Sequence, residues 1–547
     1  MFALLLRPFL PIAIFTGLMG VLSGLSVGAL LATTNTMLHD DRGATGLLLT
    51  FIGLCFLSLL GEVLSDIGTN FIGQRLIAKL RSGLTSQILT APIDQIERYK
   101  AHKISTILNQ DIDTISDFFF VLSGFCIAVA VALGCLGYLA FLSWKMFAIA
   151  FVAVLIGTLV HNFARLRGMR GFAAARDRDE DLQLQYRAIV DGAKELRINR
   201  IRRLQLHKGG LGETIRSICT LRLQAVNIFV TANAFGSALF FLVVGCMLLM
   251  QIYYPVADKA VISGFVLVLL YVKGPIEQIV GALPLIGRAQ LAFRHVADLS
   301  ARFSQQEPDL LDNDRPVIEL KMHRIELHNA CYVFPRAANG QQFKLGPINL
   351  KIDAGETLFI VGENGCGKTT LVKLLTGLYQ PSEGELLLNG CPVSPEMLDD
   401  YRQLFSAIFA DYHLFANLIS TGMSAAERAR TYLTQLEIAH KVDIRDGAFT
   451  TLDLSTGQRK RLALVQLYLE GREVLVFDEW AADQDPTFRR VFYRDLLPDF
   501  KRQGKTLIII SHDDRYFDAA DRLIRLENGQ IVEEKHILSD QSVAGVS

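Results

Sequence analysis

The sequence carries no excess charge of either sign. Lys plus Arg number 55, and Asp plus Glu also number 55, in 547 residues, so the basic bias typical of a nucleic-acid-binding protein is absent. Eight cysteines are scattered without the paired spacing of a metal site, and we expect them to be reduced and structural. The N-terminus lacks a convincing signal-peptide cleavage site, and no repeat or low-complexity tract is evident. These absences argue against a nucleic-acid partner and against a cysteine-bound metal.

Long apolar runs fill the first half of the chain instead. Hydrophobic residues make up 51% of the sequence and the mean hydropathy is +0.31, which is too apolar for a soluble enzyme. Six segments approach the roughly 20 apolar residues that cross a bilayer. They are residues 8–32, 44–64, 118–141, 146–162, 225–254 and 260–283. We therefore expect a membrane domain of six helices, the first of which is retained rather than cleaved.

Basic residues between these segments predict their orientation. Residues 65–117 contain six Lys and Arg and residues 164–224 contain fourteen, whereas the other connections carry only Arg42, Lys145 and Lys259. Because cytoplasmic loops collect positive charge, both long connections and both termini are predicted to be cytoplasmic.

Helical periodicity in the long connections predicts that membrane helices continue into the cytoplasm. We expect them to turn at tips near Asp94 and Lys194 that transmit motion; the alternative is a pair of solvated stalks.

Composition divides the chain into three parts. We predict a transmembrane domain over residues 1–300, with its two cytoplasmic extensions, a polar linker over residues 301–317 and a soluble α/β domain over residues 318–547. In the last part, β-rich runs such as residues 474–477 and 506–510 alternate with helical stretches.

A glycine-rich stretch lies between an apolar run and a helical one. Its residues are Gly362, Glu363, Asn364, Gly365, Cys366, Gly367, Lys368, Thr369 and Thr370. A strand, such a loop and a helix form a phosphate cradle, because glycines let backbone N–H groups approach the anion and the helix N-terminus faces it. We expect Lys368 to reach the β- and γ-phosphates of ATP and Thr369 to contact Mg²⁺. The alternative, a glycine-rich turn that matches by chance, is disfavoured by the flanking strand and helix.

Two carboxylates follow the apolar run at residues 474–477. Asp478 is placed to hold Mg²⁺, and Glu479 to polarise the water that attacks the γ-phosphate. Two acids after a strand are usually a solvated turn, but their position downstream of a phosphate loop favours a catalytic role.

The sequence Leu-Ser-Thr-Gly-Gln at residues 454–458 begins a basic helix, and its small residues expose donors for a second phosphate group. Together with the phosphate loop and the carboxylates, it resembles the nucleotide-binding domain of ATP-binding cassette (ABC) transporters, whose signature usually reads Leu-Ser-Gly-Gly-Gln. The resemblance implies a head-to-tail dimer in which Ser455, Gly457 and Gln458 of one subunit close over the ATP of the other.

The same resemblance assigns further positions. His512 matches the histidine that contacts the γ-phosphate, Asp485 lies in the loop that crosses the dimer interface, and Phe334 matches the aromatic residue that stacks on adenine. The family expects a glutamine where this chain has Ala410, followed by Asp411. Asp411 is our candidate to replace that glutamine.

The order of the parts is similar to that of an ABC exporter half-transporter, which has a type IV exporter-like membrane bundle of six helices and one α/β P-loop cassette. One cassette supplies half of each ATP site, so a homodimer is implied. Such a protein uses ATP and Mg²⁺ and exports cargo by alternating access across the bacterial inner membrane.

Residues 478–486 and 511–517 resemble those of the bacterial cyclic-peptide and siderophore exporters, a group that includes exporters of a microcin and of the pyoverdine precursor. The implied cargo is a modified or cyclic peptide delivered to the periplasm, where maturation or efflux proteins are further partners. A lipid flippase or multidrug exporter of the same architecture is the first alternative. A membrane-tethered regulatory ATPase is the second.

Lys273 and Glu277 are the candidate residues of the substrate cavity. They lie four residues apart in an apolar segment and flank Pro275. Two interpretations remain open from the sequence: an internal ion pair and a contact with cargo.

Overall fold

The computed structural model describes residues 7–39, 44–99, 101–253, 259–308, 310–312, 319–335, 342–418 and 423–537. The chain forms two compact units, one of residues 1–82 and 106–298 and one of residues 83–105 and 299–547. The tip of the first predicted extension thus belongs to the same unit as the soluble domain. Arg42 and residues 313–317 of the predicted linker lie outside the described residues.

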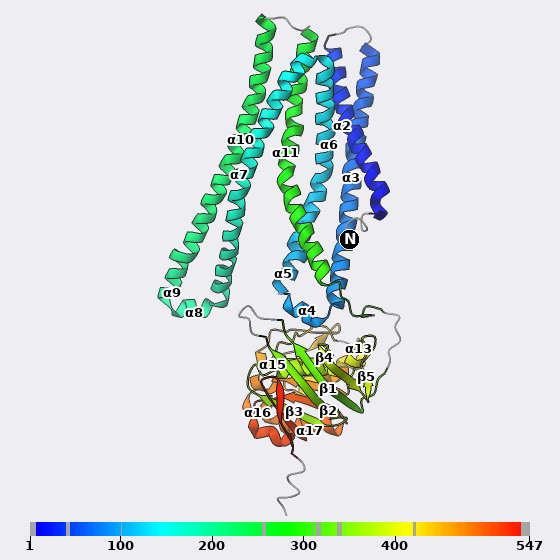
Figure 1. The fold of residues 1–547 in the computed structure, drawn as a ribbon, viewed down its shortest axis with the longest axis vertical. Coiled ribbons are helices and arrows are strands. Elements are labelled where there is room, and N and C mark those ends of the chain that lie inside the picture. Colours follow the sequence, from blue (N-terminus) through cyan, green and yellow to red (C-terminus); the bar gives the residue numbers. More distant parts are fainter. Residues whose placement is uncertain are drawn as a thin grey trace, which may run out of the picture. The chain divides into compact units, whose positions relative to one another are not determined.

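Long helices build the first unit (Figure 1). They are α2 (Leu10–Met37), α3 (Ala44–Thr90), α6 (Ile112–Leu142), α7 (Trp144–Asp191), α10 (Gly212–Tyr253) and α11 (Lys259–Arg302). Each of the six predicted apolar segments falls mainly in a different one of them. Within the described residues, the helices α2, α3, α6, α10 and α11 have the length and apolar composition to cross a bilayer, and α7 contains the remaining segment, residues 146–162.

Small residues bring α2 and α6 close together. A Cβ atom on Gly24 would lie 2.5 Å from the Cβ of Ala130, and one on Gly28 would lie 3.3 Å from the carbonyl carbon of Gly134. Small residues four apart are typical of helix packing in membranes because they allow backbones to touch.

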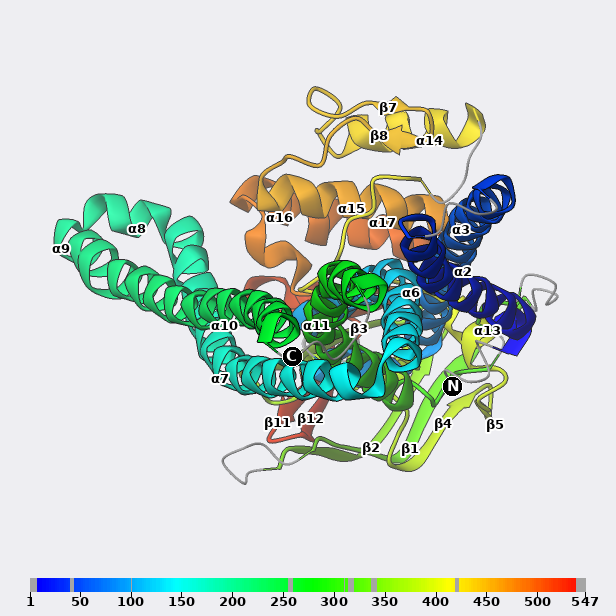
Figure 2. The ribbon, with the colours of Figure 1, turned by 90° about the horizontal axis from the view of Figure 1, so that it is seen from above.

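Helices α7 and α10 also run side by side, and the short helices α8 (Ala193–Ile198) and α9 (Arg200–Leu204) join their ends (Figures 1 and 2). The predicted tip near Lys194 is therefore α8.

Two sheets form the core of the second unit. The larger has the strand order β12-β11-β3-β10-β9-β6, and all of its strands except β12 are parallel. The smaller is antiparallel, with the order β2-β1-β4-β5. The strands are β1 (Arg324–Val333), β2 (Lys344–Asp353), β3 (Thr357–Gly362), β4 (Glu383–Leu388), β5 (Cys391–Pro392), β6 (Phe405–Ile408), β7 (Ile444–Arg445), β8 (Ala448–Phe449), β9 (Val474–Asp478), β10 (Thr506–Ile510), β11 (Arg522–Glu527) and β12 (Gln530–His536).

Helices accompany these sheets. They are α4 (Ile93–Arg98), α5 (Ala101–Thr106), α12 (Lys368–Leu375), α13 (Leu398–Arg402), α14 (Met423–Gln435), α15 (Thr456–Glu470), α16 (Pro486–Val491) and α17 (Leu497–Arg502). Short 3-10 turns occur at Arg7–Phe9, Trp480–Asp483 and Asp514–Ala519, and π-helical turns at Ile107–Asp111, Gln205–Leu211 and Phe492–Leu496. The predicted α/β class is confirmed.

Side chains of the central strands alternate between two apolar clusters. On β3, Leu358 and Ile360 lie in one cluster and Phe359 and Val361 in the other, as the two-residue period of a strand requires. The predicted runs 474–477 and 506–510 are the neighbouring strands β9 and β10, which are covered on both faces in the same way. Because parallel strands end at one edge, the loops after β3, β9 and β10 lie together.

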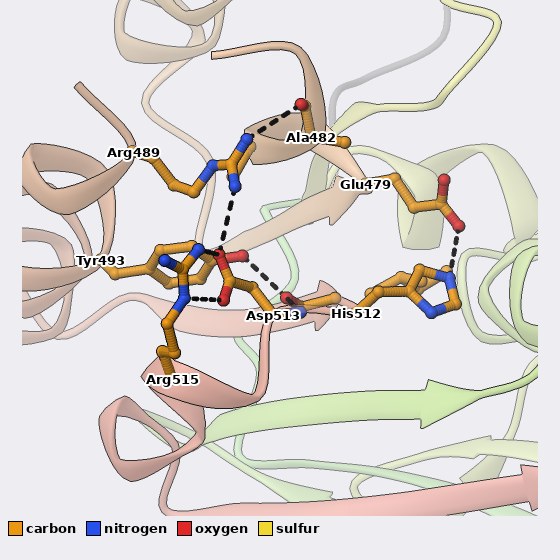
Figure 3. A pocket seen from close by; sticks show the side chains of 10 residues that line it. Glu479, Ala482, Arg489, Tyr493, His512, Asp513 and Arg515 are labelled. Carbon is orange, nitrogen blue, oxygen red and sulfur yellow. Dashed lines mark hydrogen bonds and ion pairs between the residues drawn. The ribbon is translucent and has the colours of Figure 1, made fainter. Parts of the chain in front are cut away.

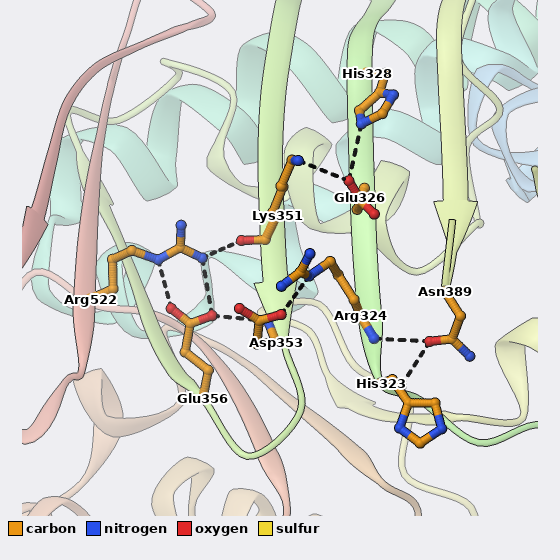
Figure 4. A network of polar contacts seen from close by, with 9 residues as sticks. All are labelled: His323, Arg324, Glu326, His328, Lys351, Asp353, Glu356, Asn389 and Arg522. Atoms are coloured by element: carbon orange, nitrogen blue, oxygen red, sulfur yellow. Dashed lines mark hydrogen bonds and ion pairs between the residues drawn. The ribbon is translucent and has the colours of Figure 1, made fainter. Parts of the chain in front are cut away.

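An arginine joins β11 to the turn before β3 (Figure 4). Arg522 Nε donates to Glu356 at 2.6 Å, its Nη1 donates to Glu534 at 2.6 Å, and its Nη2 donates to the carbonyl oxygen of Lys351. The Arg522 and Glu356 side chains are 8% and 14% exposed. Removing one partner of a pair this deep leaves the other charge uncompensated.

Replacing Arg522 with Met should therefore lower the free energy of unfolding of this unit by about 3 kcal/mol. Arg525→Met is the control, because Arg525 pairs with Glu533 at the surface, where such pairs contribute at most about 1 kcal/mol. Urea unfolding can be followed by the fluorescence of the buried Trp480 in a Trp144→Phe background. Equal losses for the two variants would contradict this prediction.

Candidate functional site

The glycine-rich stretch forms the turn between β3 and α12. Gly362 and Gly367 have φ angles of 149° and 107°, which favour glycine. A Cβ on Gly362 would lie 2.3 Å from the carbonyl oxygen of Leu526, so no larger side chain fits there. Cys366 is buried, and all eight cysteines are free thiols, as expected. The exposed residues of the loop are Glu363, Asn364 and Gly365.

Lys368 is the first residue of α12, and its buried side chain folds back onto this loop. Its Nζ donates to the carbonyl oxygens of Gly362 and Glu363, at 2.9 and 3.0 Å. An ammonium group has three N–H donors, so one remains for a phosphate oxygen. The N-terminus of α12 adds the positive end of the helix dipole. The loop thus has the donors and the space for backbone approach that a phosphate cradle needs.

A hydroxyl group and a buried carboxylate lie beside the loop. Thr369 Oγ1 donates to Asp478 Oδ2 at 3.0 Å, and Asp478 is 1% exposed. Burial raises the pKa of Asp478, while hydrogen bonds from Thr369 and from the Ala410 N–H oppose the rise. Mg²⁺ binds oxygen ligands, and usually only one or two of them are protein side chains, so the hydroxyl of Thr369 and the carboxylate of Asp478 fit this ion. They would hold it, and it would neutralise phosphate charge.

Glu479 and His512 meet across the ends of β9 and β10 (Figure 3). His512 Nε2 lies 2.9 Å from Glu479 Oε1, and the two side chains are 45% and 36% exposed, open to a ligand. Glu479 has a φ of 50°, which is uncommon for a residue with a Cβ, and Lys460 Nζ donates to its carbonyl oxygen at 2.9 Å. A proton acceptor, Glu479, and a group that can donate a hydrogen bond to a phosphate, His512, therefore lie side by side.

Ser455, Gly457 and Gln458 form the beginning of α15. The Ser455 hydroxyl accepts from the Gln458 N–H, and the Gln458 side chain accepts from the Ser455 N–H, a capping box. Asp485 accepts from Arg461 Nη2 of the same helix at 2.6 Å. The predicted residues thus fall into two groups, one around α15 and one at the ends of β3, β9 and β10.

Phe334 belongs to an aromatic cluster. Its ring makes a T-shaped contact with Tyr332 at 5.0 Å, and Tyr332 stacks on Tyr379 at 4.5 Å. Phe334 is half-buried, so part of its ring is open for stacking on a base.

The short helix α4 is anchored to this cluster and to the phosphate-loop helix. Glu97 accepts from Lys373 Nζ of α12 at 2.8 Å and from the Tyr379 hydroxyl, and Arg98 Nη2 donates to the Tyr332 hydroxyl at 3.1 Å. Burial, and then the hydrogen bond to Glu97, raise the pKa of Tyr379 and keep it a donor. The predicted tip near Asp94 is α4, whose partners could not be predicted from the sequence.

Lys273 and Glu277 form an ion pair on α11. Their Nζ and Oε1 atoms lie 3.7 Å apart, and the ammonium lies 5.9 Å from the centre of the Phe241 ring. This agrees with the ion-pair alternative.

Polar contacts between membrane helices were not predicted, and two examples illustrate them. Ser123 Oγ donates to Asp66 Oδ1 at 2.6 Å, and Ser263 Oγ donates to Asn35 Oδ1 at 3.0 Å. They link α3 with α6 and α2 with α11. The available signal was a polar residue within a predicted apolar segment or just beyond its end.

Comparisons with known proteins identify the family. Residues 9–174 match the family model of the ABC transporter transmembrane region, and residues 345–482 match that of the ABC transporter. The chain is 37% identical to the ATP-binding protein SyrD of Pseudomonas syringae pv. syringae over 531 residues, which cover 95% of this chain and 94% of the relative. The chain belongs to the ABC transporter family.

More distant similarities extend this result. The exporter is 25% identical over 511 residues to an ATP-dependent lipid A-core flippase of Burkholderia orbicola, covering 88% of this chain and 82% of the relative. A structure of a bacterial Atm1-family ABC exporter with ATP bound has a TM-score of 0.72 at 15% identity and covers 99% of this chain and 97% of that one. The predicted type IV exporter-like fold is confirmed. As an ABC exporter half-transporter, the chain binds ATP and couples its hydrolysis to transport.

The resemblance to the family predicts a glutamine at the position of Ala410. Ala410 still contributes its N–H to Asp478, and the negative charge of Asp411 adds to burial in raising the pKa of Asp478. Asp411 therefore acts on the predicted metal carboxylate through its charge. Its replacement of the glutamine stays a prediction.

The raised pKa of Asp478 predicts how ATP binding depends on pH. As the pH falls through this pKa, Asp478 takes up a proton and Mg²⁺-dependent ATP binding is lost, at a higher pH than for an ordinary aspartate. Thr369→Val removes a hydrogen bond that lowers the pKa of Asp478 and also a residue that would hold Mg²⁺, and both losses should move the midpoint to still higher pH. A fluorescent ATP analogue, titrated with and without Mg²⁺ over an acidic pH series, measures the midpoint. Thr431→Val, at an exposed position of α14 outside the site, is the control, and a common midpoint for both variants would refute the prediction.

Proposed function

We propose that this exporter is a homodimer of the bacterial inner membrane that moves a modified or cyclic peptide from the cytoplasm to the periplasm. Both termini face the cytoplasm, and the two membrane halves alternate between inward and outward access. The observation that carries the proposal is the anchoring of α4, which follows membrane helix α3 after two residues, on the phosphate-loop helix.

Hydrolysis is assigned to the pair at the ends of β9 and β10. The phosphate loop and Lys368 bind the triphosphate, and the segment 455–458 of the partner subunit closes over it. Glu479 takes a proton from water as the water oxygen attacks the γ-phosphorus, and the bond to the β-phosphate oxygen breaks to give ADP and phosphate. His512 donates a hydrogen bond to the γ-phosphate. Thr369 and Asp478 would hold Mg²⁺.

The α4 contacts provide a route from nucleotide to membrane. ATP binds more tightly to the closed pair of cassettes than to the open pair, and this difference in affinity drives the change of access. Glu97 accepts hydrogen bonds from Lys373 of α12 and from Tyr379 of the aromatic cluster around Phe334. A movement of the phosphate loop or of the residue proposed to stack on the base therefore moves α4 as well.

The peptide cargo is supported by the resemblance of residues 478–486 and 511–517 to the cyclic-peptide and siderophore exporters. The flippase relatives favour lipid as the alternative cargo. Two cytoplasmic extensions, one of them anchored on the cassette, argue against a regulatory ATPase without cargo.

Inverted membrane vesicles distinguish these functions. We expect ATP-dependent uptake of a cyclic siderophore-type peptide, no flipping of a labelled lipid A-core and no uptake of a cationic dye. Glu479→Gln should bind ATP but hydrolyse it at least about 100-fold more slowly, because the general base is lost. Lipid flipping without peptide uptake would replace the proposal by its alternative, and persistent hydrolysis by Glu479→Gln would reject the assigned base.

Glu97→Gln should uncouple hydrolysis from transport. The Lys373 ammonium and the Tyr379 hydroxyl lose a charged acceptor, a loss of about 1.5 kcal/mol or more, so the amount of peptide moved per ATP should fall about tenfold. Asp94→Asn is the matched control on α4, because it removes the same charge from the helix but leaves Glu97 and its contacts with Lys373 and Tyr379 in place. Parallel assays of uptake and phosphate release give the ratio. An equal fall in both variants would assign the effect to the charge of α4 and not to its anchor.

A further inference from the structure

Arg489 of α16 joins two loops at the edge of the large sheet (Figure 3). Its Nη2 donates to the carbonyl oxygens of Ala482 and Gln484, at 3.1 and 3.2 Å, and its Nη1 lies 3.4 Å from Asp513 Oδ2. Ala482 and Gln484 belong to the loop after β9, and Asp513 belongs to the loop after β10. One side chain therefore bridges the loops that carry the hydrolytic pair.

The loop after β10 is fixed at Asp513. Arg515 donates to both carboxylate oxygens, at 2.8 and 2.9 Å, and the Asp513 N–H donates to Ser511 Oγ at 3.1 Å. Arg515 holds the pKa of Asp513 below its usual range, so the carboxylate stays charged. These contacts fix the backbone on both sides of His512, whose ring lies 2.9 Å from Glu479.

The loop after β9 is fixed on the beginning of α15. Gln484 is 4% exposed; its Nε2 donates to the Gly457 carbonyl oxygen at 3.0 Å, and its Oε1 accepts from Arg461 Nε at 3.1 Å. A Cβ on Gly457 would lie 2.8 Å from the carbonyl oxygen of Asp483, so this loop packs directly on the segment 455–458. In the proposed dimer, that segment closes over the ATP of the partner subunit.

We infer that Arg489 is a positioning residue that couples the two ATP sites of the homodimer. The inference rests on the proposed function, because it needs two composite sites. In each subunit, Arg489 ties the pair Glu479 and His512, which acts on that subunit's own ATP, to the segment offered to the partner's ATP. A change at one site is thereby passed to the other.

The Arg489 side chain also has the features of a two-state element. Within the described part of the chain, its Nε is buried without an acceptor. A buried donor without a partner is unfavourable, so a small shift that brings the Asp513 carboxylate onto Nε stabilises a second arrangement. Coupling between sites requires such an element, biased by both ligands.

The test measures ATP hydrolysis by the full-length protein in lipid nanodiscs as a function of ATP concentration. We expect a Hill coefficient of about 2 for the wild type and about 1 for Arg489→Gln, because Hill coefficients are limited by the number of linked sites. Asp513→Asn, which changes the other residue of the Arg489–Asp513 contact, should also lower the Hill coefficient to about 1. Arg489→Lys keeps the positive charge and should retain part of the cooperativity. The control is Arg490→Gln, at the exposed neighbouring position of α16, which should keep the wild-type value.

Retained cooperativity in both Arg489→Gln and Asp513→Asn would overturn the inference, as would a dimeric, active wild type with a Hill coefficient of about 1. If Arg489→Gln does not fold, dimers that carry Asp513→Asn in both subunits and Glu479→Gln in one decide the matter. Independent sites keep about half the rate of the Asp513→Asn dimer and support the inference, whereas coupled sites lose nearly all of it and overturn it. A monomeric or inactive wild type would instead reject the proposed function.

Discussion

The buried carboxylate of Asp478 is the constraint on which the cassette depends. It ends the central strand β9, where packing on both faces leaves it 1% exposed. A carboxylate in such a place needs donors or a cation, and Thr369 and the Ala410 N–H supply two hydrogen bonds. An isolated charge is unfavourable at this position, but a carboxylate that shares a cation with a triphosphate is favourable there. The cost of burying the Asp478 charge in the free protein therefore strengthens the binding of the cation and triphosphate that the site is proposed to hold.

Much of this site could be predicted from the sequence, because its information is local. The glycines that allow the turn after β3 are close neighbours of Lys368 and Thr369, and Asp478 directly follows its strand. Parallel pairing then aligns β10 with both β3 and β9, and this brings His512 to Glu479 without any further signal. The apolar runs likewise predicted the membrane helices, since length and composition suffice for that purpose.

The long-range contacts could not be predicted, because they join residues far apart in sequence. Glu97 and Lys373 are separated by 276 residues. In the sequence, each looks like an ordinary charged residue on the solvent-exposed face of a helix. Arg489 is inconspicuous for another reason: it is one of two arginines on a short helix, and carbonyl oxygens are two of its three partners. The contacts of Asp66 and Asn35 between membrane helices were missed because a single polar residue in the sequence does not indicate which residue it will contact.

Ala410 stands where the resemblance predicts a glutamine, and the other contacts of the second unit suggest how the protein functions without that side chain. The resemblance predicts a glutamine side chain there, whereas Ala410 gives only its N–H to Asp478. Glu97 accepts hydrogen bonds from Lys373 of α12 and from Tyr379, beside the Phe334 ring expected to stack on adenine. Arg489 lies at the other end of the proposed nucleotide site, next to the residue expected to contact the γ-phosphate. On the proposed function, the base end of ATP is thus coupled to the membrane and the γ-phosphate end to the partner subunit, so that neither link depends on the missing side chain.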